Sequence, residues 1–418
     1  MDSFFLLKIT DIAKLIGLIT ERWGNQFMEK VYIVAAQRTP IGKFNGALAP
    51  LTAVQLGATV IKDTVAKAGL SAGQVDQVLM GNVIQAGSGQ NPARQAAMAA
   101  GLGQGVPAIT INDVCASGLS SINMAASLIQ SGQARVIVAG GMESMTNAPY
   151  VLAKARGGYH FGNGTLIDAM QKDALQDVYG DYPMGITAEN INDRYQITRA
   201  QQDEFALVSH QRAVRAQAAG AFNAEITPVT VTDRHGSRVV NTDEAPRPDT
   251  SLAALAKLKP AFKSDGTVTA GNASGINDGA AAVALASASA VKEFGLTPLA
   301  EWAGASLVGI DPAVMGLGPY YAINRLFQTT GLTPTDVDCY EINEAFASQT
   351  LVCQNWLKLD PATVNPRGGA IALGHPVGCS GARILVTLVH ELGDHDQHTG
   401  VASLCVGGGM GIAALVRR

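Results

Sequence analysis

An apolar strand runs directly into two glycines in RVIVAGGM, residues 135–142, and the same pattern returns near the C-terminus in VASLCVGGGM, residues 401–410. Short apolar runs that end in turn residues are typical of strands buried on both faces of a sheet. The repetition indicates two similar halves. An apolar strand followed by glycines is common in proteins, so the echo alone leaves open whether the chain is duplicated.

Outward from these two stretches, apolar runs alternate with Ala-rich segments, which predicts an α/β architecture with largely buried sheets. We expect strands at residues 30–36, 77–80, 108–112, 134–139, 337–342 and 400–406. Between residues 146 and 272 the composition shifts toward Gly, Tyr, Asp, Arg and Pro, with a helix expected at 199–220. This middle part is predicted to be an inserted region that is more polar than its flanks.

The composition sets limits on both size and partners. The chain has 418 residues, 47% hydrophobic and 15% charged, so it can bury a large core in more than one domain. A formal net charge of -4 gives no electrostatic reason to expect nucleic acid. Five cysteines without close pairs predict reduced thiols and a cytoplasmic protein. No metal site is predicted, because His375 and Cys379 have no second pair with ligand spacing.

The first 27 residues differ from the rest of the chain. Their apolar runs are interrupted by Lys8, Asp11 and Lys14, so they are too short and too charged to span a membrane. No small-residue cleavage site of a signal peptide follows them. We therefore expect Met28 to be the native start, residues 1–27 to be an upstream extension, and the protein not to associate with membranes.

Two short motifs contain candidate catalytic side chains. Cys115, in VCASG at 114–118, lies between an expected strand and a helix expected at 117–131, where the N–H groups of a helix N-terminus favour a thiolate. His375 lies between Gly374 and Pro376, and a histidine in such a loop can take the proton of a nucleophilic thiol. The alternatives are a small buried hydrophobe for Cys115 and a structural loop histidine for His375.

Two further motifs have simpler alternatives. In NEAFA, residues 343–347, Asn343 supplies an amide after an expected strand, but an ordinary helix N-cap also fits. The glycines of GGGMG, residues 407–411, suggest a dinucleotide-binding turn. The chain ends at Arg418, which leaves no room for the βαβ unit that such a turn requires.

Taken together, these motifs resemble the thiolase family across residues 28–418. Several ordered motifs at the separations of the family are a more specific signal than any one of them. The stretches that carry the resemblance are VCASG at 114–118, MG at 184–185, TAGNASG at 269–275, NEAFA at 343–347, GHP at 374–376 with SGAR at 380–383, and LCVGGGMG at 404–411.

The resemblance implies the thiolase fold, an α/β fold in which two βαβαβαββ halves pack in five layers and a loop domain is inserted in the first half. The implied domains are an N-terminal half at 28–146, completed by 277–297, a loop domain that binds coenzyme A at 147–276, and a C-terminal half at 298–418. A homo-oligomer, either a dimer or a tetramer, is also implied.

The implied activity is that of an acetyl-CoA C-acetyltransferase, which condenses two acetyl-CoA molecules reversibly to acetoacetyl-CoA and CoA with ping-pong kinetics. By the match, His375 activates Cys115, which carries the acetyl group, and Cys405 removes the α-proton of the second acetyl-CoA. His375 and a water held by Asn343 stabilise the enolate, and the N–H groups of Cys115 and Gly407 stabilise the tetrahedral intermediate. Coenzyme A thioesters are substrates, and no cofactor is implied.

The match also implies substrate-binding residues. Arg247 would contact the adenine end of coenzyme A, and Ser274 the pantetheine arm. The acyl pocket would be lined by Leu175, Met184, Met315 and Phe346, for each of which ordinary core packing is the alternative.

Several alternatives remain open. Pro183 and Cys379 resemble degradative 3-ketoacyl-CoA thiolases, which accept longer chains, whereas residues 272–279 and the pocket set resemble the acetoacetyl-CoA type. Ketoacyl synthases and hydroxymethylglutaryl-CoA synthase lack the combination of the GHP motif with a second catalytic cysteine. A non-catalytic acyl-CoA or sterol-carrier protein of thiolase shape would have lost the thiols or the histidine, and all are present here.

Overall fold

One long mixed sheet runs through the molecule in the computed structural model, which describes residues 29–234 and 236–418. Its strands, in spatial order, are β4 (Ala108–Ile111), β3 (Gln77–Gly81), β5 (Val136–Ser144), β12 (Asn277–Ser287), β1 (Val31–Arg38), β13 (Ala300–Gly309), β16 (Met410–Arg417), β15 (Thr399–Val406) and β14 (Cys339–Ile342), with the short β2 (Gly42–Lys43) beside β12. The expected strands are therefore confirmed. The expected start at Met28 and the preceding extension lie outside the described residues.

The sheet consists of two similar halves that meet where β1 pairs with β13. In the first half β5 runs parallel to β3 and antiparallel to β12. In the second half β15 runs parallel to β14 and antiparallel to β16. The stretches at 135–142 and 401–410 thus occupy corresponding places, which confirms the two halves indicated by the sequence echo.

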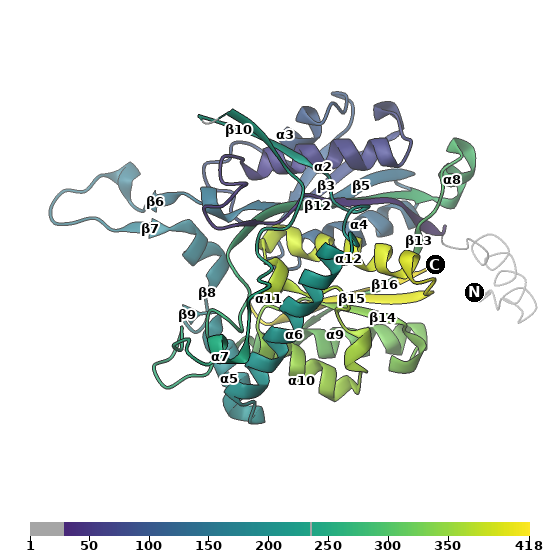
Figure 1. Cartoon of the computed structure of the whole chain (residues 1–418). Helices are drawn as coiled ribbons and strands as arrows, with labels where there is room; N and C mark the ends of the chain where they lie inside the picture. Colours follow the sequence, from purple (N-terminus) through teal and green to yellow (C-terminus); the bar gives the residue numbers. More distant parts are fainter. Residues whose placement is uncertain (1–28, 235) are drawn as a thin grey trace, which may run out of the picture.

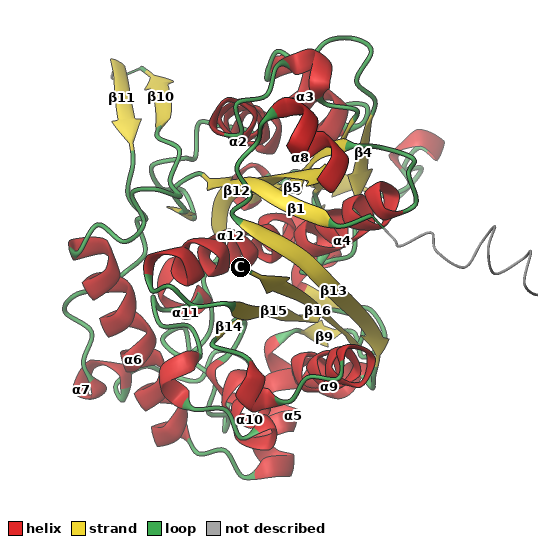
Figure 2. Ribbon diagram, turned by 90° about the vertical axis from the view of Figure 1, so that its right-hand side faces the viewer, coloured by secondary structure: helices red, strands yellow, loops and turns green. Residues whose placement is uncertain are grey.

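Helices form three layers around the two half-sheets, giving the predicted five-layer arrangement (Figures 1 and 2). The middle layer holds α4 (Ser117–Gln130) and α12 (Val377–Asp394), whose apolar side chains share one core with both half-sheets. Outer helices bury their apolar faces in separate clusters on the two outer sides. These are α2 (Ala53–Lys67), α3 (Pro92–Ala99) and α8 (Ala288–Phe294) on the first half, and α9 (Gly318–Thr330) and the end of α10 (Ala347–Leu357) on the second.

The second half departs from the predicted βαβαβαββ order at one strand. The strand expected between α10 and α12 is reduced to an isolated bridge between Tyr340 and Val364. Next to it, Asn365 adopts a left-handed conformation with φ of 48°. Its side-chain amide accepts from the N–H of Ile342 at 2.8 Å and donates to the carbonyl of Ile342 at 2.9 Å. One side chain thus replaces the backbone pairing of a strand at this edge.

Between β5 and β12 the chain leaves the sheet. This inserted region contains the hairpins β6 (Tyr150–Leu152) with β7 (Leu166–Asp168), β8 (Gln176–Asp177) with β9 (Tyr182–Pro183), and β10 (Val229–Asp233) with β11 (Gly236–Val240), and the helices α5 (Gly185–Tyr195), α6 (Arg199–Ala218) and α7 (Leu252–Leu255). The helix expected at 199–220 is α6. The β6–β7 hairpin projects from the body (Figure 1). The exact domain boundaries remain a prediction.

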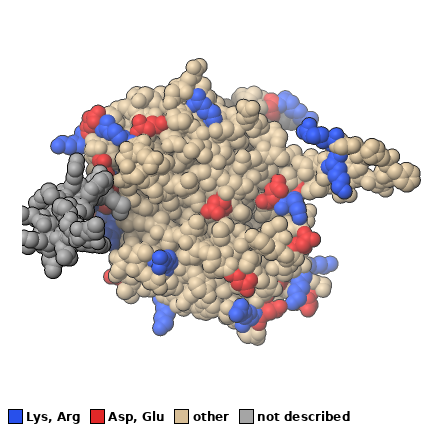
Figure 3. Space-filling model, turned by 180° about the vertical axis from the view of Figure 1, so that it is seen from behind, with Lys and Arg blue, Asp and Glu red and all other residues tan. Residues whose placement is uncertain are grey.

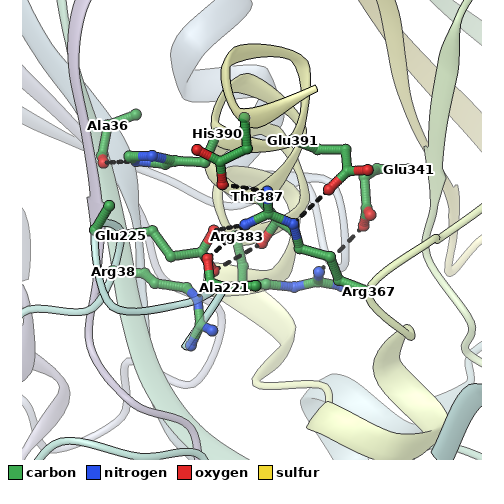
Figure 4. Close-up of polar contacts among 12 residues, drawn as sticks. Ala36, Arg38, Ala221, Glu225, Glu341, Arg367, Arg383, Thr387, His390 and Glu391 are labelled. Atoms are coloured by element: carbon green, nitrogen blue, oxygen red, sulfur yellow. Dashed lines mark hydrogen bonds and ion pairs between the residues drawn. The ribbon is translucent and has the colours of Figure 1, made fainter. Parts of the chain in front are cut away.

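Buried ion pairs connect the inserted region to both halves (Figure 4). Arg38, at the end of β1, contacts Glu225 at 2.5 Å and Asp243 at 2.7 Å. Arg367, in the second half just before the short helix α11 (Ala370–Leu373), contacts Glu225 of the insertion at 3.9 Å and Glu391 of α12 at 2.5 Å. Arg38, Glu225 and Asp243 are completely buried, and Arg367 and Glu391 are nearly so. These paired charges therefore fix the insertion to both halves.

Among the described residues, none of the helices combines the length and the apolar character needed to cross a membrane.

Candidate active site

A strained turn places Cys115 between β4 and α4. The preceding residue, Val114, has φ of 47°, a left-handed conformation that β-branched residues rarely adopt. Hydrogen bonds hold the turn: the Ser117 hydroxyl donates to the Val114 carbonyl at 2.6 Å and accepts from the Asp113 N–H at 2.9 Å. Backbone strain that the surroundings over-determine is typical of functional sites. The turn fixes the thiol just before the first turn of α4.

Cys115 is only 9% exposed, and its surroundings act on the thiol in opposite directions. Burial raises the pKa of Cys115 to about 11, whereas the backbone N–H groups of Gly407 and of Cys115 itself lower it. A Cβ atom at Gly407 would lie 3.1 Å from Cγ1 of Val114, so a glycine lets this N–H approach the thiol. Two backbone donors therefore converge on the sulfur.

His375 is held by its backbone and by its ring. Gly374, with φ of 111°, lets the chain turn so that the His375 N–H donates to Oδ1 of Asn277 at 2.9 Å. The ring atom Nδ1 lies 2.6 Å from Oγ of Ser380, and that hydroxyl donates to the Pro376 carbonyl at 3.0 Å. Since the hydroxyl hydrogen is used there, Ser380 accepts from Nδ1–H of His375. The lone pair of Nε2 is then free.

The state of the His375 ring follows from its burial. Within the described residues Nε2 has no hydrogen-bond partner. Burial, with a smaller contribution from Arg383, lowers the pKa of His375 to about 4. The imidazole is therefore neutral at physiological pH and can accept a proton at Nε2.

Cys405 lies at the end of β15 and is completely buried. It shares an apolar cluster with Met184, Met315 and Phe346. Burial raises the pKa of the Cys405 thiol well above its ordinary value, and the nearby Cys115 raises it further. The two thiols are thus close enough to influence each other.

Asn343 directly follows β14 and is completely buried. Neither the nitrogen nor the oxygen of its side-chain amide has a partner among the described residues. The following helix, α10, begins only at Ala347, so the alternative of an ordinary helix N-cap is wrong. An unpaired buried amide is suited to hold a water or a substrate oxygen.

Cys115 and His375 line the same cavity of about 530 Å³. Its walls also contain Ser274 and the predicted apolar set, Leu175, Met184, Met315 and Phe346. The loop at 269–275 is held against NEAFA, since the Ser274 N–H donates to the Ala345 carbonyl at 2.9 Å. The structure therefore brings together motifs that are far apart in the sequence.

Arg247 does not line this cavity. It lies in a separate hollow of about 210 Å³ together with His210 and Arg215. The backbone N–H of Arg247 donates to Nδ1 of His210 at 3.2 Å, so Nε2 of His210 carries the ring hydrogen. This nitrogen is buried without a partner among the described residues, and burial and the neighbouring Arg247 lower the pKa of His210 to about 4.

Comparison with known proteins gives the family. Residues 31–289 match the family model described as thiolase, N-terminal domain, and residues 296–418 match the model described as thiolase, C-terminal domain. The chain belongs to the thiolase family.

Relatives of this thiolase include the acetyl-CoA acetyltransferases of Pseudomonas aeruginosa, 52% identical, and Cupriavidus necator, 53% identical, each matched over 94% of this chain and 100% of the relative. Among solved structures, it is similar to Bacillus anthracis acetyl-CoA acetyltransferase, with a TM-score of 0.92, 45% identity, and coverage of 93% of this chain and 99% of that one. It is also similar to human mitochondrial 3-ketoacyl-CoA thiolase, with a TM-score of 0.90, 43% identity and the same coverage.

Sequence reasoning missed several residues of the thiolase site. Asn277 and Ser380 orient His375, and Phe262 adds a cavity wall. Asn277 and Ser380 lie within or next to quoted motifs, whereas Phe262 has no local signal. In the described residues, 29–234 and 236–418, no group of three or more His, Cys, Asp or Glu side chains is arranged to hold a metal ion.

Proposed function

We propose that this thiolase is an acetyl-CoA C-acetyltransferase that condenses two acetyl-CoA molecules to acetoacetyl-CoA and CoA and also catalyses the reverse thiolysis. The observation that carries the proposal is the convergence of Cys115 and His375 on one apolar cavity, with Cys405 beside them. The relatives named acetyl-CoA acetyltransferase, at 52% and 53% identity, support the same activity.

In the first half-reaction Cys115 attacks the carbonyl carbon of acetyl-CoA. Because its thiol has a pKa of about 11, a base must take the proton, and the free Nε2 of His375 is suited to do so. The N–H groups of Cys115 and Gly407 hold the oxyanion of the tetrahedral intermediate. The Cys115–carbon bond forms, the carbon–CoA sulfur bond breaks, and the departing CoA sulfur takes a proton from Cys405.

In the second half-reaction the Cys405 thiolate takes an α-proton from the second acetyl-CoA. The protonated His375 and a water held by Asn343 stabilise the enolate oxygen. The enolate carbon then attacks the acetyl group on Cys115, whose sulfur leaves and recovers its proton from His375. All three side chains return to their starting states, which accounts for ping-pong turnover.

For binding coenzyme A, Ser274 lines the cavity, which supports its proposed contact with the pantetheine arm. The hollow around Arg247, with Arg215 and the ring N–H of His210, offers positive charge and a donor to the nucleotide end. These assignments are part of the proposal.

The second candidate is a degradative 3-ketoacyl-CoA thiolase with a broader chain-length range, and the two residues that favour it lie in different places. Pro183 lines the cavity, so it can influence the substrate. Cys379 is buried in the core of the middle layer and does not line the cavity. Only Pro183 therefore bears on chain length, and the apolar set that includes Met184 and Met315 favours the short substrate.

The test compares thiolysis of acetoacetyl-CoA with thiolysis of a C8 3-ketoacyl-CoA. The proposal expects cleavage mainly of acetoacetyl-CoA and loss of turnover in Cys115→Ala. The matched control is Cys339→Ala, a buried cysteine of β14 outside the cavity, which should retain activity. Comparable rates on both substrates would move the protein to the degradative class. Coenzyme A binding without turnover in the unaltered protein would revive the non-catalytic alternative.

We further propose a homo-oligomer in the cytoplasm. The edge strand β4 exposes Ile109 to solvent, and an uncovered edge with apolar side chains favours pairing with a second copy. The projecting β6–β7 hairpin, also visible in Figure 3, exposes Tyr150 and Leu166 and is suited to join two dimers. The five cysteines are free and buried, as suits a reducing compartment. Light scattering would distinguish monomer, dimer and tetramer.

A further inference from the structure

Gln349 is a completely buried amide next to Cys405 that none of the sequence motifs indicates. It lies on α10, and its side-chain amide is 3.3 Å from Sγ of Cys405. A Cβ atom at Gly316 would lie 2.6 Å from Cβ of Gln349, so this glycine makes room for the side chain. The amide is therefore confined beside the sulfur.

The partners of the Gln349 amide decide which of its atoms faces Cys405. One end of the amide lies 3.1 Å from the Asn343 carbonyl, which can only accept. The other end lies 2.7 Å from the backbone N–H of Thr350, which can only donate. Both ends are satisfied when the nitrogen faces Asn343 and the oxygen faces Thr350. In that orientation the nitrogen is also the atom beside Cys405.

We propose that Gln349 is a positioning residue for the α-proton step, donating one amide hydrogen to the Asn343 carbonyl and the other to Sγ of Cys405. This inference rests on the proposed function, in which Cys405 becomes a thiolate when CoA leaves. The thiolate then lies in an apolar cluster with Met184, Met315 and Phe346, where a charged group needs donors. The Gln349 amide stabilises that thiolate and directs it at the α-carbon.

The Gln349 donor is important because the neighbouring thiols disfavour a thiolate at Cys405. The titratable groups that act on the Cys405 thiol are Cys115 and Cys353, both of which raise its pKa, and its own backbone N–H lowers it. Cys353 donates to the Gly316 carbonyl at 3.6 Å. Gln349 is thus the side-chain donor that faces the sulfur in the described part of the chain.

The test separates the two half-reactions in Gln349→Met. Deuterium uptake into the methyl group of acetyl-CoA measures the α-proton step. The burst of nitrophenolate from p-nitrophenyl acetate measures acylation of Cys115, and this leaving group needs no proton from Cys405. We expect deuterium uptake to fall about ten- to hundredfold, the effect of losing a hydrogen bond to a charged group, while the burst stays unchanged.

Two further variants extend this test, one that changes the charge beside Cys405 and one that serves as a control. In Gln349→Glu the ionised carboxylate cannot donate and repels the thiolate, so the pH profile of deuterium uptake should move to higher pH. Gln354→Met is the matched control, because Gln354 is a buried glutamine on the same helix, and it should retain deuterium uptake.

The outcomes distinguish this inference from the proposed function. Wild-type deuterium uptake in Gln349→Met, or an equal loss of uptake and burst, would overturn the role of Gln349. Wild-type uptake in Cys405→Ala would instead reject Cys405 as the base and so the proposed mechanism. Loss of uptake in Cys405→Ala without loss in Gln349→Met would reject the role of Gln349 alone.

Discussion

Cys115 and His375 are both kept in their uncharged forms by the protein interior. Burial raises the pKa of the thiol to about 11 and lowers the pKa of the imidazole to about 4. At neutral pH the resting pair is therefore thiol and imidazole, and not an ion pair. In the proposed mechanism the proton moves only when the thiol attacks, and the N–H groups of Cys115 and Gly407 then stabilise the oxyanion.

This state predicts the pH dependence of thiol alkylation. At pH values above the pKa of an ordinary cysteine, the thiolate fraction of Cys115 should still rise about tenfold per pH unit, because burial in the folded protein raises the pKa of Cys115 to about 11. The rate of iodoacetamide labelling of the Cys115 peptide, followed by mass spectrometry, should thus show no plateau below about pH 10. A plateau near pH 7 would indicate a thiolate–imidazolium pair.

Ser380 should affect the rate of turnover because it holds the ring of His375. In Ser380→Ala the Nδ1–H of His375 loses its acceptor 2.6 Å away, and the ring is no longer held with Nε2 free. We expect kcat for acetoacetyl-CoA thiolysis to fall about tenfold, as for the loss of one hydrogen bond, with little change in melting temperature. Ser121→Ala removes another buried hydroxyl, on α4, and should retain activity. Equal rates for both variants would contradict the assignment.

At the scale of elements, the site depends on how closely the middle helices approach the sheet. Glycines let the first turn of α12 lie against β5, since a Cβ atom at Gly141 would be 1.9 Å from the Gly378 carbonyl. The Glu143 carboxylate of β5 accepts from the Gly378 N–H at 2.9 Å, a favourable place for negative charge at a helix N-terminus. His375 and Cys115 are thus presented by corresponding helices, α12 and α4.

Gly141→Ala should therefore destabilise the fold. The added methyl group meets backbone on α12 that cannot move without shifting the helix, and overpacking of this kind costs about 1–3 kcal/mol or more. Gly103→Ala is the control, because nothing lies within 4 Å of its added Cβ atom and its backbone is not left-handed. Chemical denaturation of both variants measures the difference. A Gly141→Ala protein as stable as Gly103→Ala would show that α12 can move freely.

At the scale of the whole molecule, buried charges join segments that the sheet does not connect. Arg367 contacts Glu391 of α12, and Arg383 contacts Glu341 of β14 at 3.2 Å (Figure 4). Glu225, from the inserted region, accepts from Arg38 and from Thr387 of α12. The insertion, which supplies part of the cavity wall, is thereby held in place against β1 and α12.

Arg367→Met should be strongly destabilising, because it leaves the buried Glu391 without its charge partner. Breaking a buried pair in this way costs about 3–5 kcal/mol. Arg135→Met removes an arginine whose partner, Glu293, is exposed, and we expect its melting temperature to be unchanged. Thermal unfolding of the two variants gives the comparison. Equal melting temperatures would mean that the buried ion pairs of Arg367, which include its contact with Glu225 of the insertion, do not stabilise the fold.

The sequence by itself determined the α/β class and the motifs that carry Cys115, His375 and Cys405, and it indicated the two halves, because strand patterns and glycine-rich turns are local and leave a direct trace in residue order. Only the tertiary structure decided which side chains surround those groups. Asn277 and Ser380 contact His375, and Gln349 contacts Cys405, only because the chain folds, and the state of each thiol depends on burial. Likewise, Asn365 could replace a strand only because folding brings it beside Ile342.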